Sequence, residues 1–401
     1  MRIHLGHHFY GAGNLGDDLM LAGFLRVLGE LEPGAEVTGA VPFDRAALAG
    51  RFPRITWHGM GREERRACIA ACDAWLGLGG SPFQHAQSRW FIDHLTEEAA
   101  LCRELGKPMH FLGVGVQEEG ELGEPAVRAL VAQAGGVWTR DAASARRIHA
   151  SDAKVPAAAA ADLAHAQLAA EPPPHAKPGS VAVVANFDYG DWPGRDALLD
   201  ALEARSPARK IWLAQEAREL PGAERAIHAA LPEERRRGWE LIGPDVPGTP
   251  LSSAMARWPG AELLVTSRYH AALTGAWAGS SVVVIVTNEK LRAAADELGV
   301  PRIGPAADAE EVARALEEAR PVPPPRQLAA SARRACAEWY AAARGAMAKR
   351  NSGHLVKLDQ SLTRAAVGAP HLHGVGARGK IREKGGVAAA RIEGERADRR
   401  E

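Results

Sequence analysis

Residues 261–300 read AELLVTSRYHAALTGAWAGSSVVVIVTNEKLRAAADELGV and contain two consecutive strand–helix patterns. Short apolar runs at 261–267 and 281–286 are each followed by a longer helical pattern, at 269–279 and 289–299. Short apolar runs of this kind are typical of strands buried on both faces of a parallel sheet. The segment therefore predicts a parallel α/β unit in which polar residues follow each strand at the carboxyl edge of the sheet.

The same alternation continues on the N-terminal side of this segment. Apolar runs that predict strands lie at 2–6, 35–41, 74–79, 108–115, 136–140, 180–187, 209–215 and 239–243. Two such series predict an α/β protein with two doubly wound, Rossmann-like domains that face each other across a cleft. Ligands of such sheets bind beyond the carboxyl ends of the strands, so the residues after each strand are the candidate site residues.

Changes in composition mark the expected domain boundaries. Residues 153–180 are rich in Ala and Pro, which is typical of a crossover and linker. After residue 350 the chain is polar, rich in Gly and Arg, and without a clear period. We therefore expect an N-terminal domain at 1–165, a linker at 166–179, a C-terminal domain at 180–325, a C-terminal helix at 326–350 and a disordered tail at 351–401.

The overall composition argues against several classes of protein. Lys plus Arg number 49 and Asp plus Glu number 49, so net charge favours neither a nucleic-acid partner nor an anionic membrane. Four cysteines in 401 residues do not form a disulfide framework, and no second cluster completes a zinc site. No apolar run reaches the ~18–20 residues of a membrane span, and no signal peptide is recognisable. We expect a cytoplasmic protein.

The segment GAGNLGDD at residues 11–18 spells the G-x-G-x-x-G of a dinucleotide-binding turn, between a predicted strand and a predicted helix. Two features oppose a nicotinamide or flavin site. Asp44 lies too far along the chain to be the carboxylate expected about 20 residues on. Asp17 and Asp18 would also repel a pyrophosphate at the helix N-terminus. These carboxylates could instead cap the helix, or they could orient or deprotonate the hydroxyl groups of a polyol.

Ordered motifs along residues 1–320 resemble the polysaccharide pyruvyl transferase family. The most specific is SRYH, in which Arg268 and His270 follow a strand and precede a small-residue helix, a valine-rich strand and a segment that bears Lys290. Other motifs similar to those of the family are YGAGNLGDDLML (10–21), LGLGGSPFQ (76–84), FLGVGVQ (111–117) and VWTRDAASARRI (137–148). The chain departs from the family where Ser81 replaces a third glycine and where His85 replaces an acidic residue.

The resemblance implies a GT-B-like pair of domains and a transferase that moves the pyruvyl group of phosphoenolpyruvate onto sugar hydroxyls as a ketal. The acceptor would be a cell-surface polysaccharide or its lipid-linked precursor, which is compatible with peripheral association at the inner membrane face. The donor's phosphate and carboxylate need cations, for which Arg140, Arg268 and Lys290 are candidates. His270 is the candidate acid that protonates the enol carbon. No cofactor or metal is expected.

The remaining expected site residues lie in the two glycine turns. Gly13 and Asn14 belong to the first turn and Gly79 and Gly80 to the second, and all four are expected to bind substrate. Asp17 or Asp18 would orient or activate the acceptor hydroxyls.

Three alternatives remain open. The chain could be a GT-B-type glycosyltransferase that uses a nucleotide sugar, although the VTNEKL segment near the last strands lacks a Glu-rich nucleotide-sugar signature. It could be a non-catalytic member of the family. Each cationic residue also has a structural interpretation: Arg140 as the neighbour of a helix-capping Asp141, Arg268 as part of an ion pair, and Lys290 as a solvated lysine.

Overall fold

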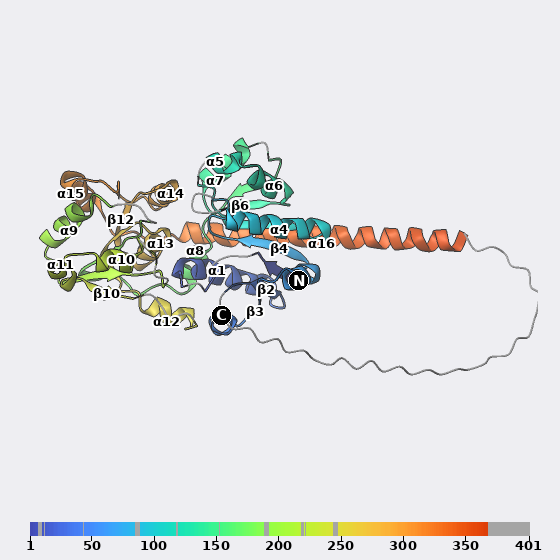
Figure 1. Ribbon diagram of the computed structural model, residues 1–401, viewed down its shortest axis with the longest axis horizontal. Coiled ribbons are helices and arrows are strands. Elements are labelled where there is room, and N and C mark those ends of the chain that lie inside the picture. Colours follow the sequence, from blue (N-terminus) through green and yellow to red (C-terminus); the bar gives the residue numbers. More distant parts are fainter. Residues whose placement is uncertain are drawn as a thin grey trace, which may run out of the picture. The chain divides into compact units, whose positions relative to one another are not determined.

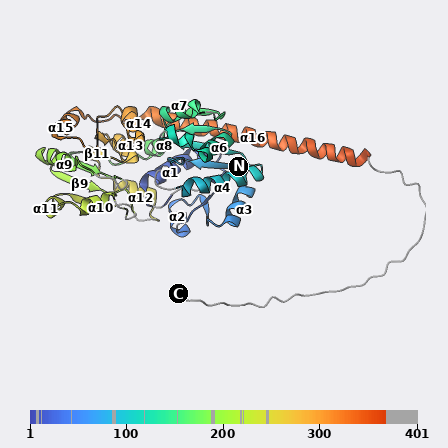
Figure 2. The same ribbon diagram turned by 45° about the horizontal axis from the view of Figure 1, so that its top comes forward.

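The computed structural model describes residues 1–367 with the exception of 7–9, 12, 43, 85–88, 118, 152, 188–191, 218–219, 221 and 244–247. Residues Met1–Lys349 form one compact unit, and a separate unit begins at Arg350. The first unit contains two parallel sheets, each with its own helices, here called lobe 1 and lobe 2 (Figures 1 and 2).

Lobe 1 holds a sheet of seven described strands in the order β3-β2-β1-β4-β5-β6-β7, and every pairing is parallel. Its strands are β1 (Arg2–Leu5), β2 (Glu36–Ala40), β3 (Ile55–His58), β4 (Ala74–Leu78), β5 (Met109–Val114), β6 (Val137–Thr139) and β7 (Ala157–Ala159). Its helices are α1 (Leu15–Leu31), α2 (Arg45–Arg51), α3 (Arg62–Ala71), α4 (Trp90–Glu104), α5 (Glu119–Gly123), α6 (Pro125–Gln133), α7 (Ala142–Ala150) and α8 (Ala164–Ala170).

Lobe 2 repeats this arrangement with six described strands in the order β10-β9-β8-β11-β12-β13, again all parallel. Its strands are β8 (Lys177–Val184), β9 (Arg209–Leu213), β10 (Glu240–Ile242), β11 (Ala261–Thr266), β12 (Ser281–Ile285) and β13 (Arg302–Ile303). Its helices are α9 (Arg195–Ala204), α10 (Glu224–Ala229), α11 (Glu233–Arg237), α12 (Leu251–Ala256), α13 (Tyr269–Ala278), α14 (Glu289–Leu298) and α15 (Ala309–Glu318).

The strand orders explain where a ligand site forms. In each sheet the chain starts in the middle, builds outward on one side, and then crosses to the other side. The direction reverses between β1 and β4 in lobe 1 and between β8 and β11 in lobe 2. Loops on either side of such a reversal point diverge and leave a crevice at the carboxyl ends of the strands. The prediction of two doubly wound domains is confirmed.

The Ala-rich segment between the lobes is more ordered than its composition suggests. Within the stretch predicted as a linker, residues 166–170 belong to α8 and residues 177–179 belong to β8. The helix is buried against α1, where a Cβ on Gly23 would lie 2.0 Å from the carbonyl oxygen of Leu163. The small side chains of alanine permit this close helix packing, so the Ala-rich composition indicates a tight contact rather than a linker.

The last helix, α16 (Arg326–Val367), follows lobe 2 in sequence but packs against lobe 1. The side chain of Trp339 is fully buried and meets the ring of Phe24 edge-on, with 5.4 Å between centroids. The helix also continues beyond residue 350, where a disordered tail was expected to begin. No proline interrupts residues 326–367, so the helical backbone hydrogen bonds can continue through this polar sequence. Residues 368–401 of the expected tail lie outside the described residues.

Candidate functional site

A cluster of polar side chains forms where strand ends of the two lobes meet. Arg140 follows β6 of lobe 1, whereas Tyr269, His270 and Lys290 follow β11 and β12 of lobe 2. The Tyr269 ring lies 4.9 Å from the guanidinium carbon of Arg140 and 5.3 Å from the ammonium nitrogen of Lys290. Both distances are within the range of cation–π attraction, so one ring holds two cations from different lobes. We call these four residues the Tyr269 cluster.

Arg140 is almost completely buried, with 1% of its surface exposed. Nη1 donates to the carbonyl oxygen of Gly80 at 3.2 Å, and Nη2 donates to the hydroxyl of Ser81 at 3.0 Å. Its Nε lies 3.6 Å from the carboxylate of Asp141. Asp141 also caps α7 by accepting from the backbone N–H of Ser144 at 2.7 Å. The cap interpretation therefore holds for Asp141, while Arg140 is fixed by the turn after β4 that contains Gly79 and Gly80.

Lys290 lies in the first turn of α14 and is half-buried. Its ammonium group makes no hydrogen bond or ion pair within the described part of the chain, and its contact is the face of the Tyr269 ring. Burial, reinforced by the nearby charge of Arg140, lowers the pKa of Lys290 to about 8, although Asp17 and Asp162 oppose the shift. An anionic ligand would restore the usual preference for the charged form, so this lysine is suited to bind one.

His270 is paired with a carboxylate that the sequence analysis missed. Its Nε2 lies 3.4 Å from Oδ2 of Asp162, whose side chain is fully buried and whose Oδ1 accepts from the N–H of Ala164 at 2.9 Å. Burial alone would raise the pKa of Asp162, but attraction to His270 and Arg140 and the bond from Ala164 lower it to about 2. The Asp162 carboxylate therefore carries its negative charge next to the His270 ring. The available signal was a single carboxylate within the Ala-rich residues 153–170.

A second carboxyl group near the cluster was also missed. Glu297 lies two turns after Lys290 on α14, and its Oε2 is buried without a hydrogen-bond partner. Burial, reinforced by repulsion from Asp162 and Asp141, raises the pKa of Glu297 to about 8. At neutral pH this carboxyl is therefore mostly protonated and does not cancel the charge of Lys290.

The first glycine turn contacts lobe 2. The carbonyl of Gly13 accepts from the N–H of Ala217 at 3.0 Å, and Asn14 forms an antiparallel bridge with Glu216 of lobe 2. Gly13 has a φ of +95°, and a Cβ there would lie 2.3 Å from that of Ala217. A Cβ on Gly16 would lie 2.0 Å from Nδ1 of His270. These glycines thus make room for lobe 2, and Gly16 gives His270 a flat surface to pack against.

The two aspartates of that turn have different surroundings. The helix is capped by Asn14, whose side chain accepts from the N–H of Gly16 at 3.0 Å, so the expectation that Asp17 or Asp18 caps it is wrong. Asn occupies the N-cap position itself, whereas the aspartates come too late in the first turn. Asp18 is buried between the N–H of Gly11 at 2.8 Å and Nε of Arg51 at 2.7 Å. Asp17 is half-buried, and its side chain makes no hydrogen bond or ion pair within the described residues.

Arg268 does not share the environment of Arg140. Its Nε donates to the fully buried carboxylate of Glu224 at 2.6 Å, and Nη2 donates to the second oxygen at 3.4 Å. Nη2 also lies 3.9 Å from Glu216. The interpretation of Arg268 as part of an ion pair is therefore correct, but the pair is buried and not on the surface.

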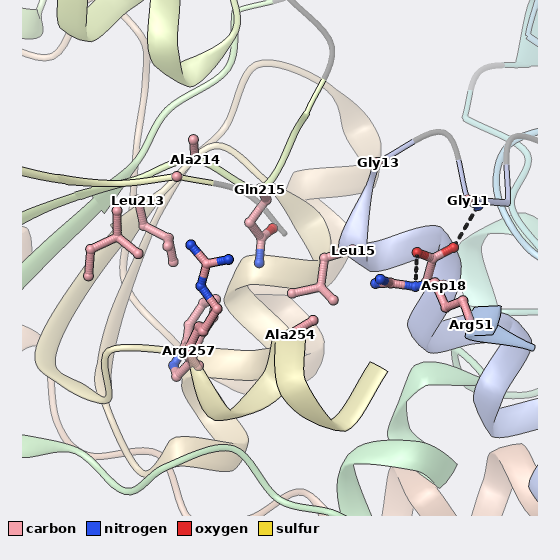
Figure 3. A pocket seen from close by; sticks show the side chains of 13 residues that line it. Gly11, Gly13, Leu15, Asp18, Arg51, Leu213, Ala214, Gln215, Ala254 and Arg257 are labelled. Atoms are coloured by element: carbon pink, nitrogen blue, oxygen red, sulfur yellow. Dashed lines mark hydrogen bonds and ion pairs between the residues drawn. The ribbon is translucent and has the colours of Figure 1, made fainter. Parts of the chain in front are cut away.

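A small cavity lies between the lobes, next to Leu15 and Asp18 in the first turn of α1 (Figure 3). Asp18 and Arg51 line it from lobe 1, and Gln215 and Arg257 line it from lobe 2. Its volume of 30 Å³ suits one or two water molecules rather than a sugar. Nε2 of Gln215 is buried without a protein partner, which fits a water site. The cavity does not include the Tyr269 cluster.

Other predictions concern groups outside this cluster. His85 lies outside the described residues. Among the described residues, no group of three or more His, Cys, Asp or Glu side chains is placed to hold a metal ion. No helix in the described part of the chain is long and apolar enough to cross a membrane.

Two Rossmann-like lobes with a charged cluster at their strand ends define a two-lobed α/β protein of the GT-B-like class. The chain is similar in fold to a putative UDP-N-acetylglucosamine 2-epimerase from Listeria monocytogenes, with 13% identity and a TM-score of 0.54 over 82% of this chain and 93% of that one. For the Neisseria meningitidis UDP-GlcNAc 2-epimerase bound to UDP-GlcNAc, the identity is 9% and the TM-score 0.54, over 85% and 99%. For Anabaena HepE in complex with UDP, the identity is 13% and the TM-score 0.50, over 90% of this chain and 99% of that one. Identities this low show the fold alone.

Sequence comparison gives the family. No curated protein matches the chain. The polysaccharide pyruvyl transferase family matches residues 14–289, which include every residue of the Tyr269 cluster except Lys290, the next residue in the chain. The chain belongs to the polysaccharide pyruvyl transferase family, which is a family of transferases.

Proposed function

We propose that the protein transfers the pyruvyl group of phosphoenolpyruvate to two hydroxyls of a sugar acceptor and forms a ketal. The observation that carries this proposal is the Tyr269 cluster, in which two cations flank one ring and an imidazole is paired with a buried carboxylate. A glycan or a lipid-linked sugar is the proposed acceptor, and the proposed site is cytoplasmic. No cofactor or metal takes part in the proposed reaction.

The donor needs cations because it carries both a phosphate and a carboxylate. Lys290 supplies a point charge that is not paired with a carboxylate among the described residues. Arg140 supplies a planar guanidinium whose position is fixed by the carbonyl of Gly80 and the hydroxyl of Ser81. Because the two residues come from different lobes, donor binding would engage both lobes.

The acid step is assigned to His270. The imidazolium gives a proton to the methylene carbon of phosphoenolpyruvate, and the neighbouring carbon becomes electrophilic. The Asp162 carboxylate, 3.4 Å from Nε2, orients the imidazole for that transfer. One acceptor hydroxyl attacks the electrophilic carbon, a second hydroxyl displaces phosphate, and the ketal closes. The two hydroxyl protons balance the methyl proton gained and the proton carried away on phosphate. In this proposal Asp17 orients the attacking hydroxyl.

A glycosyltransferase that uses a nucleotide sugar is the second candidate. It is favoured by the fold, because the similar structures include proteins solved with UDP or UDP-GlcNAc. The family match and the pairing of His270 with Asp162 favour pyruvyl transfer, since glycosyl transfer has no enol carbon to protonate.

The test is incubation with phosphoenolpyruvate and a panel of glycans and carrier-linked sugars. Pyruvyl transfer releases inorganic phosphate and raises the acceptor mass by one pyruvic acid minus one water. Parallel reactions with nucleotide sugars test the second candidate. Glycosylated product without any ketal would reject our proposal, as would donor consumption that never depends on an acceptor.

A further inference from the structure

A basic groove lies on lobe 1, apart from the Tyr269 cluster. It has a volume of 540 Å³, which is within the range of small-molecule binding sites. Helices α5, α6 and α7 line it through Leu122, Gly123, Arg128, Ala143, Arg146, Arg147, Ala150 and Ser151. We call it the α7 groove, because four of these eight residues belong to that helix.

The α7 groove is lined by three arginines and by no carboxylate. Arg128 and Arg146 are exposed, and neither side chain makes a hydrogen bond or ion pair within the described ranges. Arg147 is half-buried, and its Nη1 donates to the carbonyl of Val116 at 2.7 Å. The whole chain has a formal net charge of zero, so this group of three arginines is a local excess of positive charge. Its chemistry favours an anion with several oxygen atoms.

The shape of the α7 groove leaves room between the guanidinium groups. Ala143, Arg146, Arg147 and Ala150 recur at the spacing of one helix face, so alanines lie on both sides of the arginine pair. Gly123 of α5 adds no side chain on the opposite wall. A small charged group can therefore contact guanidinium groups from more than one helix.

The α7 groove is coupled to the proposed active site through two short connections. Helix α7 begins directly after Arg140 and Asp141, so Arg146 lies roughly two helical turns, or about 10 Å, from Arg140 along the chain. On the other side, Nη2 of Arg147 lies 3.8 Å from the carboxylate of Glu289, which precedes Lys290. A ligand bound in the groove would thus lie near the residues proposed to hold the donor.

We propose that the α7 groove binds the diphosphate of an activated or carrier-linked sugar, and so identifies the acceptor class of the proposed pyruvyl transfer. A diphosphate offers enough oxygen atoms for three guanidinium groups, whereas a neutral sugar offers no charge to offset them. The same diphosphate chemistry occurs in nucleoside-diphosphate sugars and in polyprenyl-diphosphate sugars, and the experiment separates these two sources.

The experiment measures binding by the full-length protein without phosphoenolpyruvate. The probes are inorganic pyrophosphate, a nucleoside-diphosphate sugar, a short-chain polyprenyl-diphosphate sugar and the methyl glycoside of the same sugar. The test variant is R128A/R146A. The matched control is R103A/R205A, since the side chains of Arg103 and Arg205 are also exposed and make no hydrogen bond or ion pair within the described residues. Calorimetry gives the dissociation constants, and thermal melting confirms that both variants are folded.

We expect R128A/R146A to bind pyrophosphate and at least one diphosphate sugar about tenfold more weakly than the wild type, with the control unchanged. The carrier whose affinity falls more identifies the natural source. Equal affinity in the test and control variants would overturn the proposal, as would equal wild-type affinity for the methyl glycoside and the diphosphate sugars. Binding is measured without the donor and is therefore independent of the activity assay. A protein that binds these probes but transfers no pyruvyl group in that assay would count against the proposed function and not against the groove.

Discussion

Arg140 and Arg268 both follow parallel strands, yet their surroundings give their charges different uses. Arg140 donates to a carbonyl and a hydroxyl and shares the Tyr269 ring with Lys290. Arg268 instead donates to the buried carboxylate of Glu224 at 2.6 Å and lies 3.9 Å from Glu216. The comparison shows that a position after a strand does not determine whether an arginine is already neutralised by a buried carboxylate. We expect the arginine without such a partner to bind the anionic donor more strongly.

The largest expected effect tests whether the Tyr269 cluster is catalytic. We expect His270→Ala to lower kcat by about 10²- to 10⁴-fold while the affinity for phosphoenolpyruvate stays close to that of the wild type, because the acid is lost and the cations remain. Single-turnover kinetics and donor titration measure the two quantities. The control is His175→Ala, since His175 is exposed and away from the cluster. Wild-type turnover in the His270 variant would end the acid assignment.

The next largest effect tests whether the ion pair of Arg268 with Glu224 stabilises the fold. We expect Arg268→Ala to lower the free energy of unfolding by about 3–5 kcal/mol, because the fully buried Glu224 carboxylate would lose its closest cation. Denaturant titration measures the loss.

A double variant separates charge from packing at this pair. Arg268→Leu combined with Glu224→Leu should recover much of the lost stability, since removing both partners leaves no unpaired buried charge. If instead Arg268→Ala melted like the wild type but bound the donor poorly, Arg268 would belong with Arg140 as an anion clamp.

A pair of glycine variants tests how the acid is positioned. We expect Gly16→Ala to lower kcat by about 10²-fold, because its new Cβ would occupy space 2.0 Å from Nδ1 of His270 and displace the ring. Gly34→Ala is the matched control, since a Cβ there meets nothing within 4 Å. Full activity in the Gly16 variant, with unchanged melting, would show that the imidazole does not depend on this contact.

The smallest effect concerns the charge of Lys290. Its pKa of about 8 means that the free site loses this cation as pH rises above 8, so KM for phosphoenolpyruvate should increase by up to about tenfold per pH unit there. In Lys290→Arg the guanidinium stays charged, and KM should remain flat over the same range. Initial rates from pH 7 to 10 measure both. An equally steep rise in the arginine variant would assign the titration to another group.

The contribution of Lys290 to stability and its contribution to donor binding change in opposite directions as pH rises. Because the folded pKa lies below the unfolded value of 10.5, the unfolded chain holds this proton more tightly between pH 8 and 10.5. The contribution of this lysine to stability therefore rises with pH across that window. Donor affinity falls over the same window, so melting curves and KM values together separate the two effects.

The sequence was sufficient for the features that depend on local pattern. Apolar runs of five to eight residues located most strands, and the residues after them included Arg140, His270 and Lys290. Three short strands, β3, β7 and β13, were missed. The three alanines of β7, for example, are not distinct from a helix or linker.

The features that depend on long-range contacts could not be read from the sequence. Asp162 and His270 are far apart in the chain, and only the folded lobes bring them within 3.4 Å. The same holds for Glu224, which neutralises Arg268 from α10. The dinucleotide-like glycine pattern was ambiguous for a related reason, since its glycines are explained by contacts with Ala217 and His270 of the other lobe.

The fit of Gly16 against His270 has a consequence for engineering by recombination. Each lobe is a separate Rossmann-like module, so exchanging whole lobes between relatives is an obvious way to alter acceptor choice. A chimaera would assemble correctly only if a residue without a side chain in one parent met an imidazole of matching position in the other. This pair of positions should therefore be compared between parents before any hybrid gene is made, together with the contact of Gly13 with Ala217.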